Sequence, residues 1–202
     1  MMADALAARR PPAKSRLRMR LAALALALPV AACGGATLDT YDLSAARPAP
    51  ELARSARLRV AEPVAALDLD SERILVRTGA HQLAVLAGAR WPDRLPVVVQ
   101  ARLTQSFQNS GLARQVGRNP AATADYVLDL DIRKFELDVA RSRVEIDIAA
   151  KLLATKGGVV AAEIFTAAAP VASTAPATVV AAMNEALASV LKRLVAFAAT
   201  RI

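Results

Sequence analysis

The sequence predicts an α+β domain in which two main helices pack on one face of an antiparallel sheet of about six to seven strands. Residues 125–148 alternate between apolar and polar side chains, as strands covered on one side do. Residues 95–107 and 177–199 instead repeat their apolar side chains at helical spacing. Each set leaves one apolar face, so the strands and the helices are expected to share a core.

The first half of the chain predicts short strands separated by breaks. Residues 40–43 alternate like a first strand, and the prolines within residues 47–50 then end it. Residues 58–61 form the next candidate strand. Residues 73–77 and 82–86 flank a turn that contains glycine, which indicates a hairpin.

The first helix is expected directly after Trp91-Pro92-Asp93, because a helix tolerates proline in its first turn. Its buried face would carry Leu95, Val99, Leu103 and Phe107. Gly111 is placed to end the helix in the left-handed conformation, and residues 112–116 are expected to begin another strand. Trp91 is interpreted as a packed cap over the start of the helix.

The long strand of residues 125–139 changes phase in the middle. Leu128 and Ile132 are apolar at even positions, whereas Phe135 and Val139 are apolar at odd positions. Both halves can face one core only if a residue is inserted at Arg133-Lys134, as in a β-bulge.

The remaining segments complete the sheet and its second helix. Residues 144–148 alternate, and Lys156-Gly157-Gly158 forms a turn into residues 159–169, which gives an antiparallel meander. Residues 177–199 form a long amphipathic helix, and its charged residues argue against a membrane span.

Residues 1–32 are typical of a bacterial lipoprotein signal peptide. Six Lys and Arg residues precede the ten-residue apolar run 21–30, which is about half of the length needed to cross a bilayer. Val30-Ala31-Ala32 then leads to Cys33, the only cysteine. We expect cleavage after Ala32 and acylation of Cys33, with residues 33–38 as a lipidated tether and residues 39–202 as the folded domain.

Other interpretations of this leader remain open. Cys33 could be an ordinary small apolar residue or an unused thiol, and Met19 could be the true start of the chain. Twin-arginine export is discounted, because Pro11-Pro12 follows Arg9-Arg10 where that signal has a polar residue followed by apolar ones.

The charge of the chain lies mainly in the leader. The whole chain has 26 Lys and Arg against 18 Asp and Glu, a net charge of +8. Without residues 1–32 the balance is 20 against 17, or +3, so nucleic-acid binding loses its main support. A single cysteine excludes an intramolecular disulfide, and stability must come from an apolar core.

Few residues are suited to catalysis. His81 is the only histidine and is expected in a surface loop, and no nucleophile turn, phosphate-binding loop or zinc-ligand set occurs. Carboxylates with a period of two are interpreted as the solvated face of a sheet, with arginines and lysines beside them. These are Asp129, Asp131, Glu136, Asp138, Glu145 and Asp147. We therefore predict no catalytic residue, no cofactor and no metal site.

The ordered motifs resemble the family of ABC-type transport auxiliary lipoprotein components. The resemblance rests on the lipobox and on five short motifs in order: Tyr41-Asp42-Leu43, Leu58-Arg59-Val60, residues 69–77, Arg90-Trp91 and residues 124–128. The family usually has two tyrosines at the first motif and Trp-Ala after the arginine, whereas this chain has Thr40-Tyr41 and Trp91-Pro92.

The resemblance implies a non-enzymatic periplasmic lipoprotein that works with an ABC permease, an ATPase and an MCE-type substrate-binding protein in lipid movement between the two membranes. Its partners would be the membrane, through the lipid anchor, and these transport components, with a homo-oligomer as a further option. Gly34 follows the cysteine, and the absence of an aspartate there favours the periplasmic face of the outer membrane over the inner membrane. The alternative is a free-standing structural or envelope-assembly lipoprotein, and a lipid-anchored hydrolase is a distant third.

Cys33→Ser is predicted to give a protein that takes up no labelled fatty acid and either partitions into the soluble fraction or remains as the precursor. The reason is that acylation of Cys33 is the proposed anchor, and two or three acyl chains hold a protein stably on a bilayer. Labelling of the variant at the level of the unsubstituted protein would contradict the lipobox interpretation.

Overall fold

The computed structural model describes residues 38–49, 56–112, 116–120 and 123–202. These residues belong to one compact unit, Ala36–Ile202. The predicted signal peptide, cleavage after Ala32 and acylation of Cys33 lie outside the described residues.

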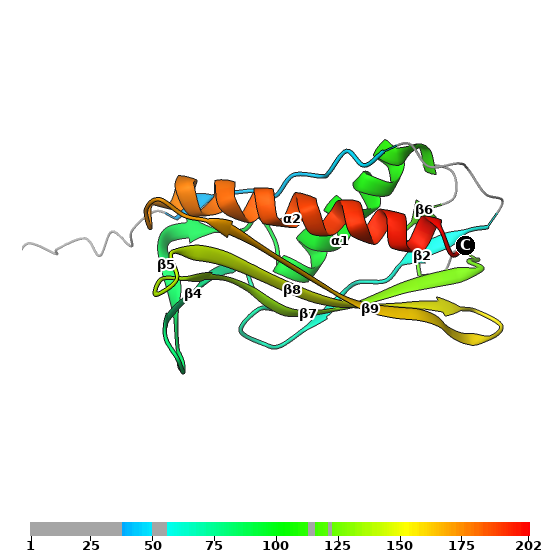
Figure 1. The fold of residues 1–202 in the computed structure, drawn as a ribbon, viewed down its shortest axis with the longest axis horizontal. Coiled ribbons are helices and arrows are strands. Elements are labelled where there is room, and N and C mark those ends of the chain that lie inside the picture. Colours follow the sequence, from blue (N-terminus) through cyan, green and yellow to red (C-terminus); the bar gives the residue numbers. More distant parts are fainter. Residues whose placement is uncertain (1–37, 50–55, 113–115, 121–122) are drawn as a thin grey trace, which may run out of the picture. The chain divides into compact units, whose positions relative to one another are not determined.

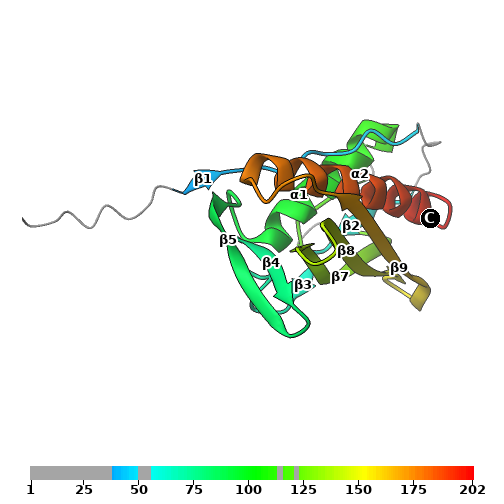
Figure 2. The same ribbon diagram turned by 60° about the vertical axis from the view of Figure 1, so that its left-hand side comes forward.

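The predicted α+β class with two main helices is confirmed, and both helices lie on one side of a single sheet (Figures 1 and 2). Within the described residues the sheet has nine strands, more than the six to seven predicted. They are β1 (Asp39–Thr40), β2 (Leu58–Val60), β3 (Val64–Ala65), β4 (Arg73–Gly79), β5 (Gln82–Arg90), β6 (Val116–Gly117), β7 (Tyr126–Asp138), β8 (Arg143–Ala154) and β9 (Gly158–Pro170). The excess comes from β1, β3 and β6, which are two residues long and too short to show an alternating pattern.

The sheet is mixed rather than wholly antiparallel. The β4–β5 hairpin and the β7–β8–β9 meander are antiparallel, as predicted. On its other edge, however, β7 pairs in parallel with β2, then β3, then β4. Parallel neighbours need a long connection, and here the chain passes from β5 through α1 (Leu95–Phe107) before it returns as β7.

The predicted bulge in β7 is confirmed. Ile132 pairs with Ile148 and Lys134 pairs with Asp147, so Arg133 is the extra residue. Leu130 and Ile132 before the bulge are buried, and so is Phe135 after it, at 1% exposure. Val139 differs, because it lies beyond the end of β7 and is 39% exposed. It belongs to the β7–β8 turn, in which the Ser142 N–H donates to the Val139 carbonyl. Its predicted place in the core was wrong.

α1 begins later than predicted, and a π-helical turn follows it. Its first residue is Leu95, and the proline in its first turn is Pro96 rather than Pro92. Gly111 has a φ of 96°, the left-handed conformation expected of it, and lies within the π-helical turn η1 (Gln108–Leu112) that follows α1. Of the strand expected at residues 112–116, Leu112 belongs instead to η1 and Val116 belongs to β6, and residues 113–115 lie outside the described residues.

Trp91 is packed in the core just before α1. It is 1% exposed, and its ring meets Phe135 edge to face with the centroids 6.0 Å apart. Packing of Trp91 was predicted, and the structure adds that its partner is the first core residue after the bulge in β7.

The second helix, α2 (Pro176–Ala199), matches the predicted segment and lies over β8 and β9. Its buried stripe includes Val180, Met183, Leu187, Leu191 and Leu194. No helix among the described residues is both long enough and apolar enough to cross a membrane.

The segment after β1 is held by the helices rather than by the sheet. The Asp42 carboxylate pairs with Arg102, the Ser44 N–H donates to Asn184, and the Ala46 N–H donates to the Ser106 hydroxyl at 2.9 Å. Of the strand predicted at residues 40–43, only Thr40 therefore lies in β1. Beyond it, the backbone N–H groups of Ser44 and Ala46 bond to side chains of the helices rather than to a neighbouring strand.

Candidate functional site

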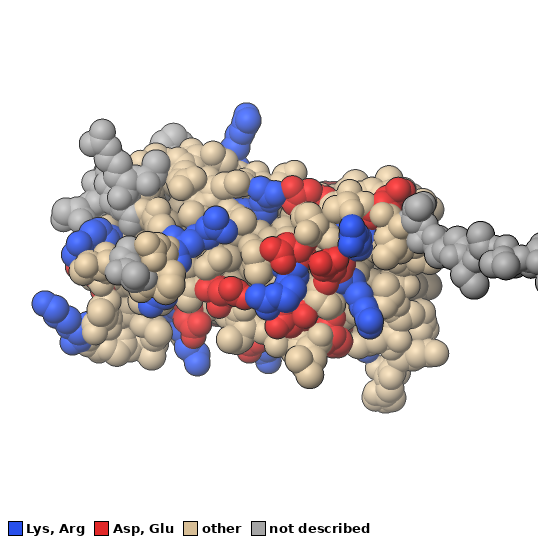
Figure 3. All heavy atoms as spheres, turned by 180° about the vertical axis from the view of Figure 1, so that it is seen from behind, with Lys and Arg blue, Asp and Glu red and all other residues tan. Residues whose placement is uncertain are grey.

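The charged residues of β4, β7, β8 and the β7–β8 turn form the candidate site, which we call the charged face. It comprises Arg77, Arg133, Lys134, Glu136, Asp138, Arg141, Arg143, Glu145 and Asp147. Acidic and basic side chains are interspersed in the same way on the side of the domain seen in Figure 3. The bulge matters for this arrangement, because it turns Lys134 and Glu136 to the face opposite Phe135.

The most buried ion pair of the charged face joins β4 to β7. Arg77 donates to both oxygens of Glu136, from Nε at 2.6 Å and from Nη2 at 3.0 Å. Glu136 is only 3% exposed, although its position in the alternation predicted a solvated side chain. The hydrogen bonds to the Glu136 carboxylate raise the pKa of the Arg77 guanidinium above its ordinary value, so Arg77 stays charged at neutral pH.

The second pair closes the turn between β7 and β8. Asp138 accepts from the Arg141 N–H at 3.0 Å and from its guanidinium at 3.1 Å. Ser142 follows with a φ of 48°, a left-handed residue in this tight turn. The turn therefore places Arg141 next to Asp138 and within 3.3 Å of Glu145.

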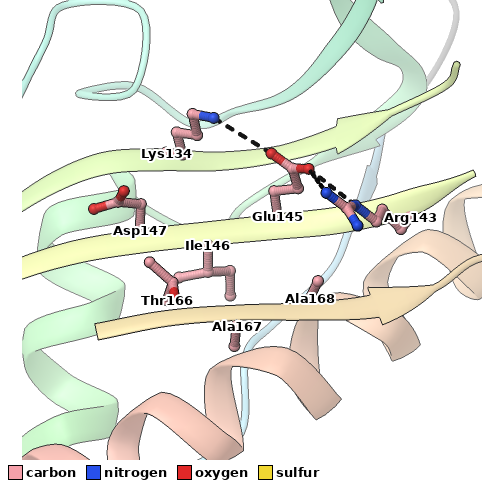
Figure 4. A pocket seen from close by; sticks show the side chains of 8 residues that line it. All are labelled: Lys134, Arg143, Glu145, Ile146, Asp147, Thr166, Ala167 and Ala168. Carbon is pink, nitrogen blue, oxygen red and sulfur yellow. Dashed lines mark hydrogen bonds and ion pairs between the residues drawn. The ribbon is translucent and has the colours of Figure 1, made fainter. Parts of the chain in front are cut away.

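Glu145 is the acceptor shared by three cations. Arg143 donates to it from Nε at 2.9 Å, Lys134 lies at 3.3 Å, and Arg141 approaches from the turn (Figure 4 shows Arg143 and Lys134). The hydrogen bonds from Arg143, and then from Lys134, lower the pKa of the Glu145 carboxyl below its ordinary value. The carboxylate is therefore ionised at neutral pH and cannot supply a proton.

Two hollows flank this network. One, of about 360 Å³, lies over β8 and β9 and is lined by Lys134, Arg143, Glu145, Ile146, Asp147 and Thr166–Ala168 (Figure 4). The other, of about 550 Å³, lies between the β4–β5 hairpin and the β7–β8 turn and is lined by Arg77, Gly79, Ala80, Lys134, Asp138, Ala140 and Arg141. Lys134 lines both hollows, so a ligand bound in either hollow could contact its side chain.

The structure corrects the interpretation of the carboxylates in part. Asp131 is exposed, as predicted, whereas Asp129, Glu145 and Asp147 are half-buried and Glu136 and Asp138 are 3% and 4% exposed. A fully solvated face was therefore wrong for all of these acids except Asp131. Glu136 and Asp138 are the most buried of them. They are buried because Arg77 and Arg141 cover and pair with them. The signal in the sequence was the set of arginines and lysines around the acids, which indicates mutual pairing as well as solvation.

His81 lies in the exposed turn between β4 and β5, as predicted. Within the described residues, no three His, Cys, Asp or Glu side chains are arranged to hold a metal ion. The acids of the charged face are instead directed at arginine and lysine. The arrangement defines a class of protein, namely a small α+β domain that presents an ion-paired sheet surface.

Comparison with known proteins assigns the family. The family model described as "ABC-type transport auxiliary lipoprotein component" matches residues 41–195. The chain therefore belongs to the family of ABC-type transport auxiliary lipoprotein components.

Two other proteins are similar to this chain over most of its length. The structure of protein XCC0632 from Xanthomonas campestris is similar, with a TM-score of 0.73 and 33% identity over 81% of this chain and 95% of that one. The uncharacterized protein bll6063 of Bradyrhizobium diazoefficiens is 34% identical over 168 residues, which are 80% of this chain but only 46% of that protein. A further uncharacterized protein of known structure, at 16% identity and a TM-score of 0.62, shares the fold.

The motifs that carried the resemblance hold the fold together. Asp42 pairs with Arg102 of α1, and Leu43 beside it is 2% exposed. Asp125, just before β7, accepts from the Arg57 N–H at 2.8 Å and from its guanidinium, and these bonds lower the pKa of the Asp125 carboxyl. Asp42 and Asp125 of these two motifs therefore have structural roles.

Arg77→Met is predicted to destabilise the protein by about 3 kcal/mol, because it leaves the Glu136 carboxylate buried without a partner. The double variant Arg77→Met with Glu136→Met should recover most of this loss, since no charge is then left buried. Urea denaturation followed by circular dichroism measures both. Equal stability of the single variant and the original protein would show that Glu136 is solvated after all.

Proposed function

We propose that the protein is a non-enzymatic, lipid-anchored periplasmic lipoprotein that assists an ABC-type transport system by contact with its other components. The observation that carries this proposal is the family match, which spans residues 41–195 and so covers nearly the whole folded domain. In this proposal Cys33 carries the lipid, Ala32 is the last residue removed, and the domain works at the membrane surface.

The geometry of the charged face supports a contact role. A catalytic carboxyl needs a pKa near the working pH, whereas Arg143 and Lys134 lower that of Glu145. Glu136 and Asp138 are each held by an arginine, which occupies the oxygens that a substrate or a metal would need. Such a surface suits the recognition of a charged partner, where polar groups fix orientation more than affinity.

The finer assignment follows from the family and from the leader. We propose that the transport system is of the MCE type, that its cargo is lipid, and that the anchor sits in the periplasmic face of the outer membrane, with a permease and an ATPase as the further components. Two or three acyl chains on Cys33 would suffice for stable anchoring. The transport system, rather than this chain, would supply the energy.

The test is complementation of a strain that lacks the gene, scored by lipid transport between the two membranes. His81→Ala, and Asp129→Asn combined with Asp131→Asn, should transport as well as the unsubstituted gene, because contact rather than proton transfer is proposed. The matched control for loss of structure is Leu187→Ala. Leu187 is fully buried in α2, so this variant should lose about 2–5 kcal/mol of stability and accumulate less.

The decisive comparison is between abundance and transport. Immunoblotting should show the His81 and Asp129/Asp131 variants at normal levels. If either one accumulates normally but does not transport, the non-enzymatic proposal fails, and a hydrolytic or metal-dependent role takes its place.

A further inference from the structure

β9 is a free edge of the sheet in the described structure, since its only neighbouring strand is β8. It is 13 residues long and carries one charged residue, Glu163. Val159, Val160 and Ile164 are exposed at 62%, 45% and 54%. Natural edge strands are usually short, charged or covered, so a long apolar edge needs an explanation.

The backbone groups along this edge point away from the sheet. Arg193 of α2 donates to the Thr166 carbonyl, which therefore faces away from β8. In a strand the N–H and C=O of one residue point to the same side, and alternate residues repeat this, so Ile164 and Ala162 face outward as well. Pro170 is also at an outward-facing position, where its lack of an N–H leaves no donor unpaired. Val171, one residue later, faces the other way, and its N–H bonds to the Ser142 carbonyl.

A groove runs beside this edge. Thr166, Ala167 and Ala168 of β9 form one wall, and Glu185, Ala186, Ser189 and Arg193 of α2 form the other, around about 500 Å³. In both ribbon views β9 runs obliquely to α2 (Figures 1 and 2). An edge strand with a helix beside it is the geometry in which binding domains add an extended segment to a sheet.

The charged residues beside the β9 edge indicate the chemistry of the segment. Glu185 and Arg193 line the groove, and Glu163 lies on β9 outside its lining. Arg193 is engaged with the Thr166 carbonyl, which leaves the two acids for a ligand. Glu163 and Glu185 make no hydrogen bond or ion pair within the described part of the chain. Glu163 shares its face of β9 with Phe165, which contacts Phe197 of α2, so the side chains of an added strand on that face would meet both acids. On the opposite face they would meet Ile164.

We propose that the β9–α2 groove binds an extended segment of a partner protein, which adds a strand to the β9 edge. The segment carries Lys or Arg on the side that faces Glu163 and Glu185, and apolar side chains on the side that faces Ile164. This proposal concerns a surface of the folded domain and does not depend on the transported cargo or on the membrane that holds the anchor.

A second copy of the chain fits this edge less well. Antiparallel pairing of two β9 edges brings two unpaired Glu163 side chains onto one strip, and like charges at close cross-strand positions are destabilising. A segment that carries Lys or Arg next to Glu163 avoids this repulsion.

The test uses the purified full-length protein in detergent and a fluorescein-labelled octapeptide that alternates valine with lysine. Ala162→Pro removes an outward N–H without breaking the β8 ladder, and Ala162→Val is its matched control because it keeps that N–H. Fluorescence anisotropy should show about tenfold weaker binding to the proline variant and less than twofold change for the valine variant. Amide exchange at Ala162 and Ile164 should slow when the peptide binds.

Charge reversal provides a second variant in case the proline disturbs folding. Glu185→Lys should weaken the lysine peptide several-fold and improve binding of a peptide with glutamate in place of lysine. Asp131→Lys is the control, since Asp131 is exposed on β7 away from the groove and should leave the affinity within twofold.

Three outcomes overturn the proposal. They are an octapeptide that does not bind, a peptide that binds Ala162→Pro and Glu185→Lys as well as the original protein, and a dimer of this protein in sedimentation that Ala162→Pro dissociates. The last outcome would assign the edge to a second copy.

Discussion

The pairing of β7 is the constraint on which the rest of the domain depends. Residues 126–138 pair with β8 along one edge and with β2, β3 and β4 in turn along the other. The strand must present apolar side chains to the helices over its whole length, yet its sequence changes phase. Arg133 resolves this conflict by standing outside the ladder. Without such a bulge, either Ile132 or Phe135 would face away from the core.

The bulge also determines where the charges lie. Because Phe135 turns toward Trp91, Glu136 turns to the outer face, where Arg77 of β4 covers it. The same phase places Lys134 next to Glu145. The charged face is thus a consequence of how the core is packed, and the helices on the opposite side leave it open to a partner. The β9 edge adjoins this network, because Thr166, Ala167 and Ala168 line both the hollow over β8 and β9 and the β9–α2 groove.

Long periodic elements could be predicted from the sequence, because the same spacing of apolar residues repeats over many positions and indicates one type of structure. The meander, α2 and the bulge itself fall in this group. The parallel pairing of β2, β3 and β4 with β7 could not be predicted, since it depends on contacts between residues distant in the chain and leaves no local pattern. The same holds for Glu136 and Asp138, which have the alternation of solvated residues but are covered by arginines from elsewhere in the fold.

The most direct test of this account is to delete single residues from β7 and measure the free energy of unfolding in urea. Deleting Arg133 removes the bulge and leaves every β7–β8 pair in place, so the loss should stay below about 2 kcal/mol. Deleting Asp131 instead forces Ile132 out of the core and Arg133 into it, or brings Asp129 inside, and should cost more than about 3 kcal/mol. Equal losses for the two deletions would contradict the claim that the bulge at Arg133 sets the phase of the sheet.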